Sequence, residues 1–314
     1  MQLSNPTSKI LHESHAPALE AYRKHGNTFP VTAEIDLTMR CSLDCKGCHS
    51  KWLHNPSELS AEQINRVLYQ LQHHGCKSVV WSGGGEPLES PHWLHAMKEA
   101  RHLGLSQGLY SYLPQLDQNR VNTLSHYCEF IYAHNNQRPV QKPPETKCVW
   151  TAGFLLDDKN WPRIREFYEK TNWELFDFCD FRPLIVSGAD YSWAPKAIEA
   201  FEALERFDKL PRLRWASYKF YDLTRENRGR TYDKCRSTHF SISVGSKGEV
   251  WECLNRRGIT NIGNLLEEDL ETIWARKPQC REDLTSCRIL CRGHEINKTL
   301  HSIFGPAPTH VEFA

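Results

Sequence analysis

Strand-like and helical segments alternate between residues 30 and 190, and this alternation limits the possible folds more than any other feature of the chain. Strands are expected at 31–37, 77–81, 107–112, 129–134, 148–156 and 176–182. Helices are expected at 60–75, 90–104, 117–127 and 159–171. Six strands that alternate with helices predict an α/β fold with a parallel, helix-covered sheet or a partial barrel. In such folds the loops that follow the strands carry the chemistry.

The helix expected at 60–75 has clear signals at both ends. Ser60 can cap its N-terminus, and Gln63 stands at the third helical position, which is the pattern of a capping box. Apolar residues follow at helical spacing as far as Leu71, and Gly75 ends the helix.

The pattern changes after about residue 190. A helix near 198–204 leads into a charged and aromatic stretch, and a hairpin signal follows at 240–253, with a Gly-Ser-Lys-Gly turn at its centre. A last helix is expected near 270–274. The chain is therefore expected to comprise an N-terminal extension (1–29), a barrel (30–190), a bridging basic and aromatic segment (191–234), a small C-terminal domain of β-hairpin and helix (235–300) and a C-terminal tail (301–314).

Twelve cysteines are an unusual number for a chain that begins without a basic stretch followed by an apolar run. No window approaches about 18 consecutive apolar residues, so no membrane span is expected. We therefore expect a cytoplasmic protein, and in that reducing compartment so many cysteines indicate metal or iron–sulfur chemistry before disulfides. The net charge of +1 argues against a globally basic nucleic-acid binder.

Three of the cysteines lie on one loop directly after the first expected strand. Cys41, Cys45 and Cys48 are separated by three and then two residues. Thiolates at this spacing can converge on one iron–sulfur cluster, and three ligands leave one iron of a four-iron cubane open. The alternative is a zinc site with His49 as the fourth ligand, or cysteines without a common role.

A glycine run follows the second expected strand. Ser82 precedes Gly83, Gly84 and Gly85, and Glu86 and Pro87 complete the motif. Glycine permits positive φ and a close approach of the backbone to a ligand. The alternative is a plain strand-to-helix turn, but its place at the same end of the sheet as the cysteine loop favours a binding role.

The two motifs together resemble the radical S-adenosylmethionine (SAM) superfamily. The resemblance covers about residues 30–190 and implies a (β/α)6 partial TIM barrel. It implies that Cys41, Cys45 and Cys48 hold a 4Fe–4S cluster whose open iron binds SAM. Reduction then cleaves SAM to methionine and a 5′-deoxyadenosyl radical, which abstracts a hydrogen from the substrate. The implied cofactor-binding residues are Gly83, Gly84, Gly85, Glu86 and Pro87.

Two positions depart from that family pattern. The family usually has an aromatic residue before the third cysteine, where this chain has Gly47, so support for the adenine must come from elsewhere. A serine often ends the fourth strand, where this chain has His134. His134 is a candidate catalytic and cofactor-binding residue that could donate to a carboxylate, or it is a structural strand-end histidine.

Four further cysteines frame the C-terminal domain. Cys235 and Cys253 bracket the hairpin, and Cys287 and Cys291 follow a Gly-Asn-Leu step. This pattern resembles the truncated SPASM or twitch domain and implies an auxiliary 4Fe–4S cluster held entirely by protein ligands. Four thiolates also suit structural zinc. Cys280 is a possible substitute ligand.

The remaining cysteines stand among apolar neighbours at helix or strand positions. They are expected to be small buried hydrophobic residues, although one could be a hydrogen-atom donor; they are Cys76, Cys128, Cys148 and Cys179.

Two features of the sequence indicate the class of substrate. Arg182 lies in a Phe-Arg-Pro-Leu step at the end of the sixth strand. It is a candidate catalytic residue that could bind a carboxylate or phosphate; the alternative is an ion pair with Asp180 alone. Residues 205–236 hold ten Lys/Arg against five Asp/Glu, interleaved with aromatic residues. That composition suits phosphates and stacked bases, or a solvated bridge whose aromatics pack on the barrel.

The leading hypothesis is therefore a radical SAM enzyme that acts on a phosphate-bearing nucleotide, nucleotide sugar or modified nucleoside, by rearrangement, decarboxylation or dehydrogenation. One such reaction is the isomerisation of an amino-acid-modified thymidine in phage DNA. The resemblance also implies a flavodoxin- or ferredoxin-like electron donor. The alternatives are a radical SAM enzyme that modifies a peptide and a non-enzymatic zinc or iron–sulfur protein that binds nucleic acid.

Overall fold

The computed structural model describes most of the chain. It describes residues 9–45, 47–48, 50–134, 138–186, 188–224, 230–277, 284–285, 287, 291 and 293–306, with only the backbone of His134.

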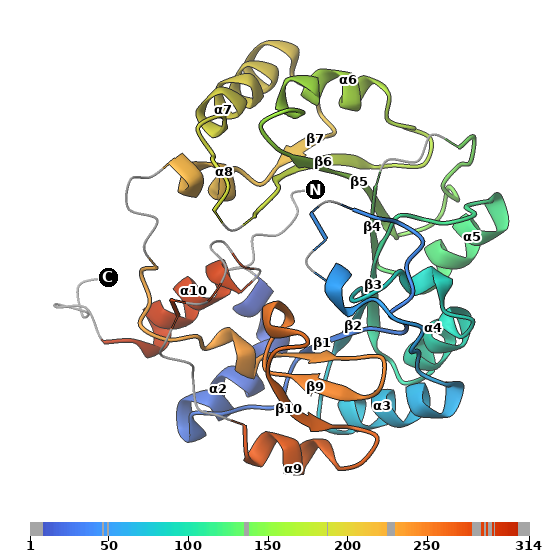
Figure 1. Ribbon diagram of the computed structural model, residues 1–314, viewed down its shortest axis with the longest axis vertical. Coiled ribbons are helices and arrows are strands. Elements are labelled where there is room, and N and C mark those ends of the chain that lie inside the picture. Colours follow the sequence, from blue (N-terminus) through green and yellow to red (C-terminus); the bar gives the residue numbers. More distant parts are fainter. Residues whose placement is uncertain are drawn as a thin grey trace.

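Parallel strands form the core of the molecule. Seven of them follow one another across the sheet in chain order: β1 (Thr32–Ile35), β2 (Ser78–Trp81), β3 (Ser106–Ser111), β4 (Phe130–His134), β5 (Val149–Leu156), β6 (Phe178–Pro183) and β7 (Leu213–Trp215). The six strands expected from the sequence are all present, and β7 adds to them at the β6 edge. Figure 1 shows the sheet curving into an open half-barrel.

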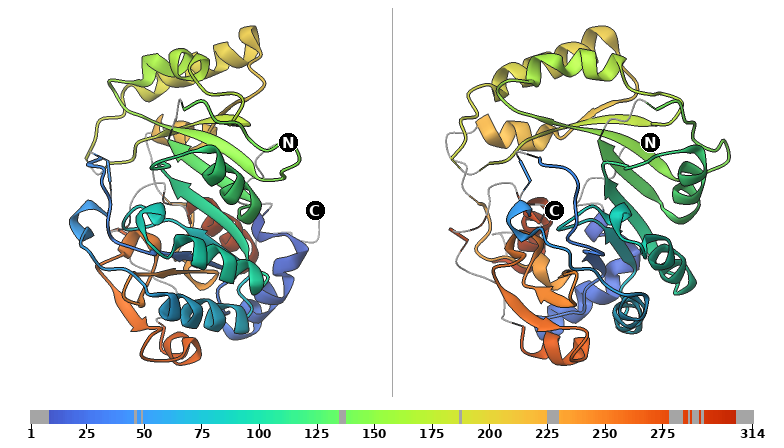
Figure 2. Two further views of the ribbon diagram at one scale, coloured as in Figure 1. Left: turned by 90° about the vertical axis from the view of Figure 1, so that its right-hand side faces the viewer. Right: turned by 45° about the vertical axis from the view of Figure 1, so that its right-hand side comes forward.

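Helices cover the convex side of this sheet (Figures 1 and 2). They are α3 (Ala61–His73), α4 (Trp93–His102), α5 (Gln118–Tyr127), α6 (Ile164–Glu169) and α7 (Ala194–Ala203). The expected capping box forms at the start of α3, where the Ser60 side chain accepts from the backbone of Gln63 and the Gln63 side chain accepts from the backbone of Ser60. The expectation of an α/β partial barrel is confirmed.

Strand periodicity separates the two faces of the sheet, because successive side chains point in opposite directions. On β1, Ala33 and Ile35 are buried in the large core beneath the helices, whereas Thr32 and Glu34 face the inside of the half-barrel.

The four cysteines expected to be small core residues are all buried: Cys76, Cys128, Cys148 and Cys179.

The C-terminal hairpin extends the same sheet. Strand β8 (Ser241–Val244) pairs in parallel with β1, with Thr32 opposite Ser241 and Ile35 opposite Val244. Strands β9 (Glu249–Trp251) and β10 (Asn261–Asn264) continue the sheet as antiparallel neighbours, and α9 (Leu270–Ala275) follows. The hairpin that the sequence predicts thus closes directly onto the first barrel strand.

The two ends of the described chain pack together. Helix α2 (Ala16–His25) and helix α10 (His294–Phe304) share a second, smaller core with the residues just before β1 and β8. The buried residues of this core are Ile10, Tyr22, Val31, Phe240 and Leu300. Helix α10 runs through the domain boundary expected at residue 300.

The other elements are one short helix and several single turns. Helix α8 (Ser217–Thr224) follows β7, and the turns are η1 (Glu13–His15), η2 (Lys51–Leu53), η3 (Pro87–Glu89), η4 (Trp161–Arg163), η5 (Leu204–Asp208), η6 (Ser237–His239) and η7 (Leu254–Arg256). Among the described residues, no helix combines the length and the apolar character needed to cross a lipid bilayer.

Candidate active site

The loop after β1 carries the first three cysteines, as the sequence predicts. Cys41 and Cys48 are half-buried and Cys45 is exposed, and a turn closes where the Cys48 amide donates to the Cys45 carbonyl at 3.1 Å. Partial desolvation of the thiol groups raises the pKa of Cys41 and Cys45, although Cys45 as a whole residue is exposed. Because a thiolate is the form that binds metal, these thiols need a metal ion or cluster to stay deprotonated at neutral pH. His49, the candidate zinc ligand, lies outside the described residues.

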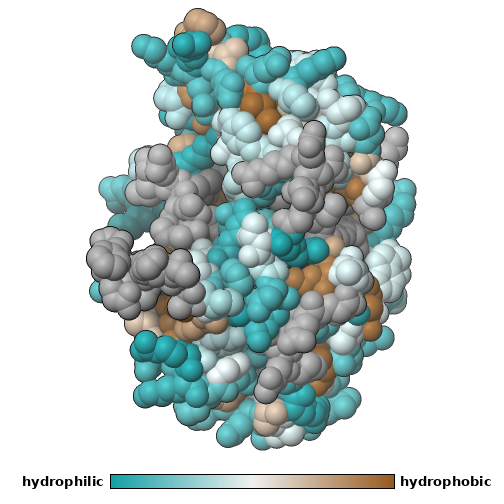
Figure 3. All heavy atoms as spheres, turned by 90° about the vertical axis from the view of Figure 1, so that its left-hand side faces the viewer, coloured by the Kyte–Doolittle hydropathy of each residue, from teal (hydrophilic) through white to brown (hydrophobic). Residues whose placement is uncertain are grey.

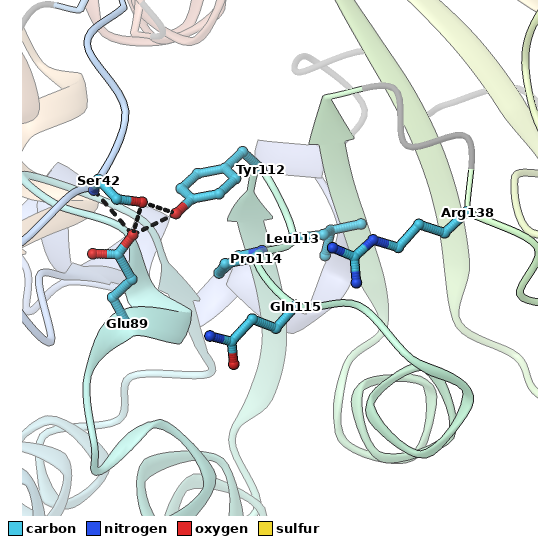
Figure 4. Close-up of a pocket in the computed structure, with 7 residues that line it drawn as sticks. All are labelled: Ser42, Glu89, Tyr112, Leu113, Pro114, Gln115 and Arg138. Carbon is cyan, nitrogen blue, oxygen red and sulfur yellow. Dashed lines mark hydrogen bonds between the residues drawn. The ribbon is translucent and has the colours of Figure 1, made fainter.

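A hydrogen-bonded clamp holds the start of this loop (Figure 4). The Ser42 backbone amide and hydroxyl donate to Glu89 Oε1 at 3.0 and 2.6 Å, and the Tyr112 hydroxyl donates to the same oxygen. Glu89 ends η3 and Tyr112 follows β3, so the clamp joins three loops. These side chains border a shallow pocket of about 520 Å³ beside the loop after β3. The clamp fixes the backbone next to Cys41.

The glycine run lies against the segment that leads from β1 to the cysteines. The Gly85 amide donates to the Thr38 carbonyl at 3.1 Å, and the Glu86 amide donates to the Arg40 carbonyl at 2.8 Å. A Cβ on Gly85 would lie 2.2 Å from that Arg40 oxygen, so only glycine permits the approach. The run therefore sits beside the cysteine loop, as the sequence predicts, and the close approach that requires glycine at this position is to the protein's own backbone.

Glu86 is buried and held by protein groups. Its carboxyl accepts from the Ser111 hydroxyl at 2.6 Å, from the Tyr112 amide at 3.0 Å and from the Leu88 amide at 3.1 Å. Burial raises the pKa of Glu86 to about 7, against these hydrogen bonds, which lower it. In this structure Glu86 links the glycine run to the end of β3, and Pro87 begins η3.

The two departures from the family pattern take different positions. A Cβ on Gly47 would lie 2.5 Å from a methyl carbon of Leu184, so the Leu184 side chain, just after β6, fills the space beside the third cysteine. His134 is the last residue of β4 and pairs with Gly153 of β5 at the carboxyl end of the sheet. Only its backbone is described, so its role stays a prediction.

A cavity of about 1620 Å³ occupies the inside of the half-barrel and extends to the C-terminal domain. Residues of β1, β2, β3, β4 and β6 line one side of it, and Cys235, Cys253, Cys287 and Cys291 border the other. Figure 3 shows the molecule from the open side, where hydrophilic side chains predominate and apolar groups appear in separate patches. One cavity therefore reaches both the barrel interior and the second set of cysteines.

Arg182 faces this cavity from β6. Its Nε donates to Asp180 Oδ2 at 2.6 Å, and its guanidinium carbon lies 4.2 Å from the centre of the Tyr132 ring. The ion pair considered for Arg182 in the sequence is therefore present, and the residue also lines the cavity. A guanidinium held by a carboxylate and an aromatic ring keeps a fixed direction, which suits the recognition of an anion.

The second set of cysteines lies around one end of the cavity. Burial and, to a smaller extent, the neighbouring Cys235 thiol raise the pKa of Cys253 to about 12 and that of Cys291 to about 11. Asn297 supports Cys235, because its amide Nδ2 donates to Sγ at 3.4 Å. Cys287 is half-buried at the same cavity, while Cys280 lies outside the described residues.

The segment 205–236 divides between packing and the cavity wall. Phe220 and Tyr232 are buried, and Trp215 stacks on Phe201 at 4.7 Å, which agrees with the packing alternative. Arg214, on β7, nevertheless lines the cavity, with its guanidinium carbon 3.0 Å from the centre of the Phe178 ring. Among the described residues that line the cavity, six Lys/Arg stand against four Asp/Glu.

The described residues also bring Asp222, His294 and Glu295 within 4.8 Å of one another. Lys298 Nζ lies 2.9 Å from Glu295 and 3.6 Å from Asp222. The Lys298 ammonium already pairs with both carboxylates. This cluster of described residues is therefore explained as an ion-pair network rather than as a metal site.

Several residues of this site were not identified from the sequence. Glu89 and Tyr112 form the clamp, and Tyr110 lines the cavity; Arg214, which also lines it, belongs to the basic segment 205–236 expected to suit phosphates. Glu89 stands three residues after Glu86 of the glycine motif, and this closeness was a weak signal of a role at the site. Its hydrogen-bond partners, however, come from loops far away in the chain. Arg257, four residues after Cys253, reaches the end of β1, and nothing in its sequence context indicated this contact.

The comparisons with known proteins agree with this geometry. Residues 235–299 match the SPASM family model, described as an iron–sulfur cluster-binding domain. No curated protein matches the chain in sequence.

Similar solved structures cover nearly the whole chain. Streptococcus suis SuiB bound to its precursor peptide SuiA has a TM-score of 0.62 at 17% identity, over 88% of this chain and 72% of SuiB. SuiB bound to S-adenosylmethionine gives 0.60 at 17% identity, over 89% and 71% of the two chains. Native anSMEcpe with bound AdoMet gives 0.57 at 13% identity, over 86% and 88% of the two chains. At these identities the likeness concerns the fold.

These findings confirm the resemblance expected from the cysteine and glycine motifs. The chain shares its fold with SuiB and anSMEcpe, and its C-terminal residues 235–299 match the SPASM family model, as the resemblance implied. The expected cofactor classes, iron–sulfur clusters and SAM, agree with the SPASM match and with the AdoMet-bound structures that share the fold.

Proposed function

We propose that this protein is a radical SAM enzyme that removes a hydrogen atom from an anionic, phosphate-bearing substrate held in the 1620 Å³ cavity. The observation that carries this proposal is the cavity itself, which joins the barrel interior to the cysteines of the SPASM domain. A nucleotide, nucleotide sugar or modified nucleoside has the size and charge that such a cavity can hold.

The donor sets fit the proposed cofactors. Three cysteines on one loop supply soft thiolate ligands for a 4Fe–4S cluster and leave one iron for SAM, and four further cysteines can complete a second cluster. Reduced at such a cluster, SAM supplies a carbon radical strong enough to take a hydrogen atom from an unactivated C–H bond.

The chain's own residues have three tasks in this reaction. The clamp of Ser42, Glu89 and Tyr112 fixes the cysteine loop. Arg182 and Arg214 attract and orient the anionic part of the substrate, because both guanidinium groups line the cavity and stack on aromatic rings. The walls of the half-barrel limit the access of water to the reacting carbon.

A peptide substrate is the second candidate. Among the structures that share the fold are SuiB bound to its precursor peptide SuiA and anSMEcpe with the Cp18Cys peptide. The excess of cations in the cavity favours the phosphate-bearing class, whereas these neighbours favour a peptide.

A substrate screen tests the proposal. The protein is reconstituted with iron and sulfide without oxygen and incubated with SAM, dithionite and separate sets of nucleotide sugars, nucleosides, DNA with modified thymidine, and peptides. Release of 5′-deoxyadenosine is then measured by mass spectrometry. We expect release to rise only with a phosphate-bearing set. Stimulation by peptides alone would select the second candidate, and no SAM cleavage in any set would reject the enzyme class.

The role of Arg182 is tested by comparing two variants, Arg182→Met and a matched control. Arg182→Met is expected to raise the KM for the active substrate at least tenfold, because it removes a charge-assisted contact, and to leave the slow cleavage of SAM without substrate unchanged. Arg165→Met is the matched control, since Arg165 pairs with Asp208 on the outside of the molecule.

A further inference from the structure

We propose that Arg257 of the SPASM domain is a positioning residue for the SAM site of the barrel; this proposal rests on the proposed function. Arg257 connects the two cysteine sites. In the chain it stands four residues after Cys253 of the SPASM domain. Its side chain lies against the segments on both sides of the barrel's cysteine loop.

The contacts of Arg257 are with buried groups. Its Nε lies 2.8 Å from Asp36 Oδ2, and its Nη2 lies 3.2 Å from Glu34 Oε1 and 3.4 Å from the Ser243 hydroxyl. The Arg257 side chain is 2% exposed and that of Asp36 is 0% exposed. One guanidinium therefore contacts two carboxyl groups at the end of β1 and also touches β8.

Asp36 carries this contact to the glycine run. A Cβ on Gly83 would lie 1.9 Å from Asp36 Oδ1, and a Cβ on Gly84 would lie 3.4 Å from Oδ2, so the carboxylate lies directly against the backbone of both glycines. The same backbone run donates at Gly85 to the Thr38 carbonyl. The position of the Asp36 carboxylate therefore limits where the glycine run can lie.

Ser50 carries a second contact to the far end of the cysteine loop. The Ser50 hydroxyl lies 3.5 Å from Arg257 Nη1, and Ser50 is buried two residues after Cys48. The following residue of the SPASM domain adds to this contact. Gly258 has a φ of +71°, and a Cβ there would lie 2.4 Å from Leu53 of η2. The SPASM loop is therefore packed against the segment that leaves the cysteine loop.

These contacts make a specific assignment. A buried arginine that holds two carboxylates and the cysteine loop sets the relative position of the glycine run and the three cysteines, which are the groups proposed to bind SAM and its cluster. Lysine keeps the charge but cannot contact three directions through a planar fork. Contacts that orient ligands indirectly typically change affinity by about 10- to 100-fold when they are removed.

The test uses full-length, reconstituted protein with Arg257→Lys and Asp36→Asn. For each variant we would measure the iron content, the dissociation constant for SAM by anaerobic calorimetry, and the electron paramagnetic resonance spectrum of the reduced clusters with and without SAM. Arg276→Lys is the matched control, because Arg276 makes an exposed ion pair with Glu268 in the same domain. If Arg257→Lys does not fold, Asp36→Asn carries the test.

We expect both variants to keep about eight irons per chain, to bind SAM about tenfold more weakly and to lose part of the spectral change that SAM causes in the parent protein. Arg276→Lys is expected to match the parent. Unchanged SAM affinity and spectra in Arg257→Lys would overturn the assignment, and so would the loss of only the SPASM irons. A parent protein that binds clusters but shows no response to SAM would instead overturn the proposed function, and this assignment with it.

Discussion

The two cysteine sites differ in how the protein surrounds them. The barrel site has three cysteines on one loop, with Cys45 exposed. The SPASM site collects cysteines from four places in the C-terminal domain, and burial raises the pKa of Cys253 to about 12. A three-ligand site leaves a coordination position for an exchangeable ligand, whereas a four-ligand site leaves none. Under the proposed function, the barrel site is therefore the one that binds SAM, and the SPASM site has no free coordination position.

The supports of the two sites differ as well. The barrel loop is held by hydrogen bonds that the Ser42 and Tyr112 hydroxyl groups donate to Glu89. The SPASM site is held by the buried Asn297, whose Oδ1 accepts from the backbone amides of Arg236 and Ser237 while its Nδ2 donates to Cys235. The first support joins loops, and the second joins a helix to the backbone beside a cysteine. Each of these two supports can therefore be removed without touching the other.

The largest effect is expected from the barrel cysteines. Cys41→Ala should abolish the cleavage of SAM and remove about four irons per chain, because two thiolates cannot hold the cubane in place of three. Iron analysis and the release of 5′-deoxyadenosine would measure both. Residual SAM cleavage at a tenth of the parent rate or more would contradict the assignment of the open site to this loop.

Cys253→Ala should also remove about four irons, but from the other site. SAM should still bind, and the electron paramagnetic resonance spectrum of the remaining cluster should still change when SAM is added. This variant separates the sites most directly. If it lost its response to SAM while keeping the barrel irons, the coupling between the two sites would extend beyond the contacts of Arg257 to the SPASM cluster itself.

A smaller effect is expected from the two supports. Glu89→Gln should slow SAM cleavage about tenfold and leave the SPASM irons in place, because it weakens the clamp beside Cys41. Asn297→Ala should instead affect the SPASM site, so that the protein holds fewer SPASM irons while its affinity for SAM stays nearly normal. Iron content and SAM affinity measured for both variants would show whether each support serves its own site; equal effects on both sites would contradict this.

The smallest effect concerns pH and the barrel site alone. Burial raises the pKa of Glu86 from 4.5 to about 7, so the folded protein keeps a proton that the unfolded chain releases. The contribution of Glu86 to stability is therefore present below about pH 4.5 and declines by about 3 kcal/mol as the pH rises through 7. Glu86→Gln should remove this decline, which thermal midpoints between pH 5 and 8 would show. Parallel pH curves for the two proteins would contradict it.

The sequence predicted the local elements well. The capping box of Ser60 and Gln63 forms, and the six expected strands are present, because caps and periodicity depend on neighbouring residues. The hairpin at 240–253 was also expected from its turn and alternation. Its partner was not, because the pairing of β8 with β1 joins segments about 200 residues apart, and a hairpin pattern does not say which strand edge it will meet.

The residues of the candidate site also fall into those that the sequence identified and those that only the structure revealed. Spacing alone selected Cys41, Cys45 and Cys48, and the glycine run was identified by composition. The contact of Arg257 with Asp36 was not predictable, because charged residues near cysteines are common and only the packing of the SPASM loop on β1 buries this pair.

The amino-acid order by itself determined which residues form strands and helices, which cysteines share a loop, and the class of cofactor that such thiol groups can bind. Tertiary structure decided that the C-terminal hairpin joins the barrel sheet, that one cavity reaches from the barrel interior to the second set of cysteines, and that Arg257 lies against Asp36 at the end of β1. Periodicity and ligand spacing act over a few residues and can be recognised in a linear chain. The other features require distant segments to exclude water together, and that depends on which sheet edges and side-chain faces remain free once the local elements have formed.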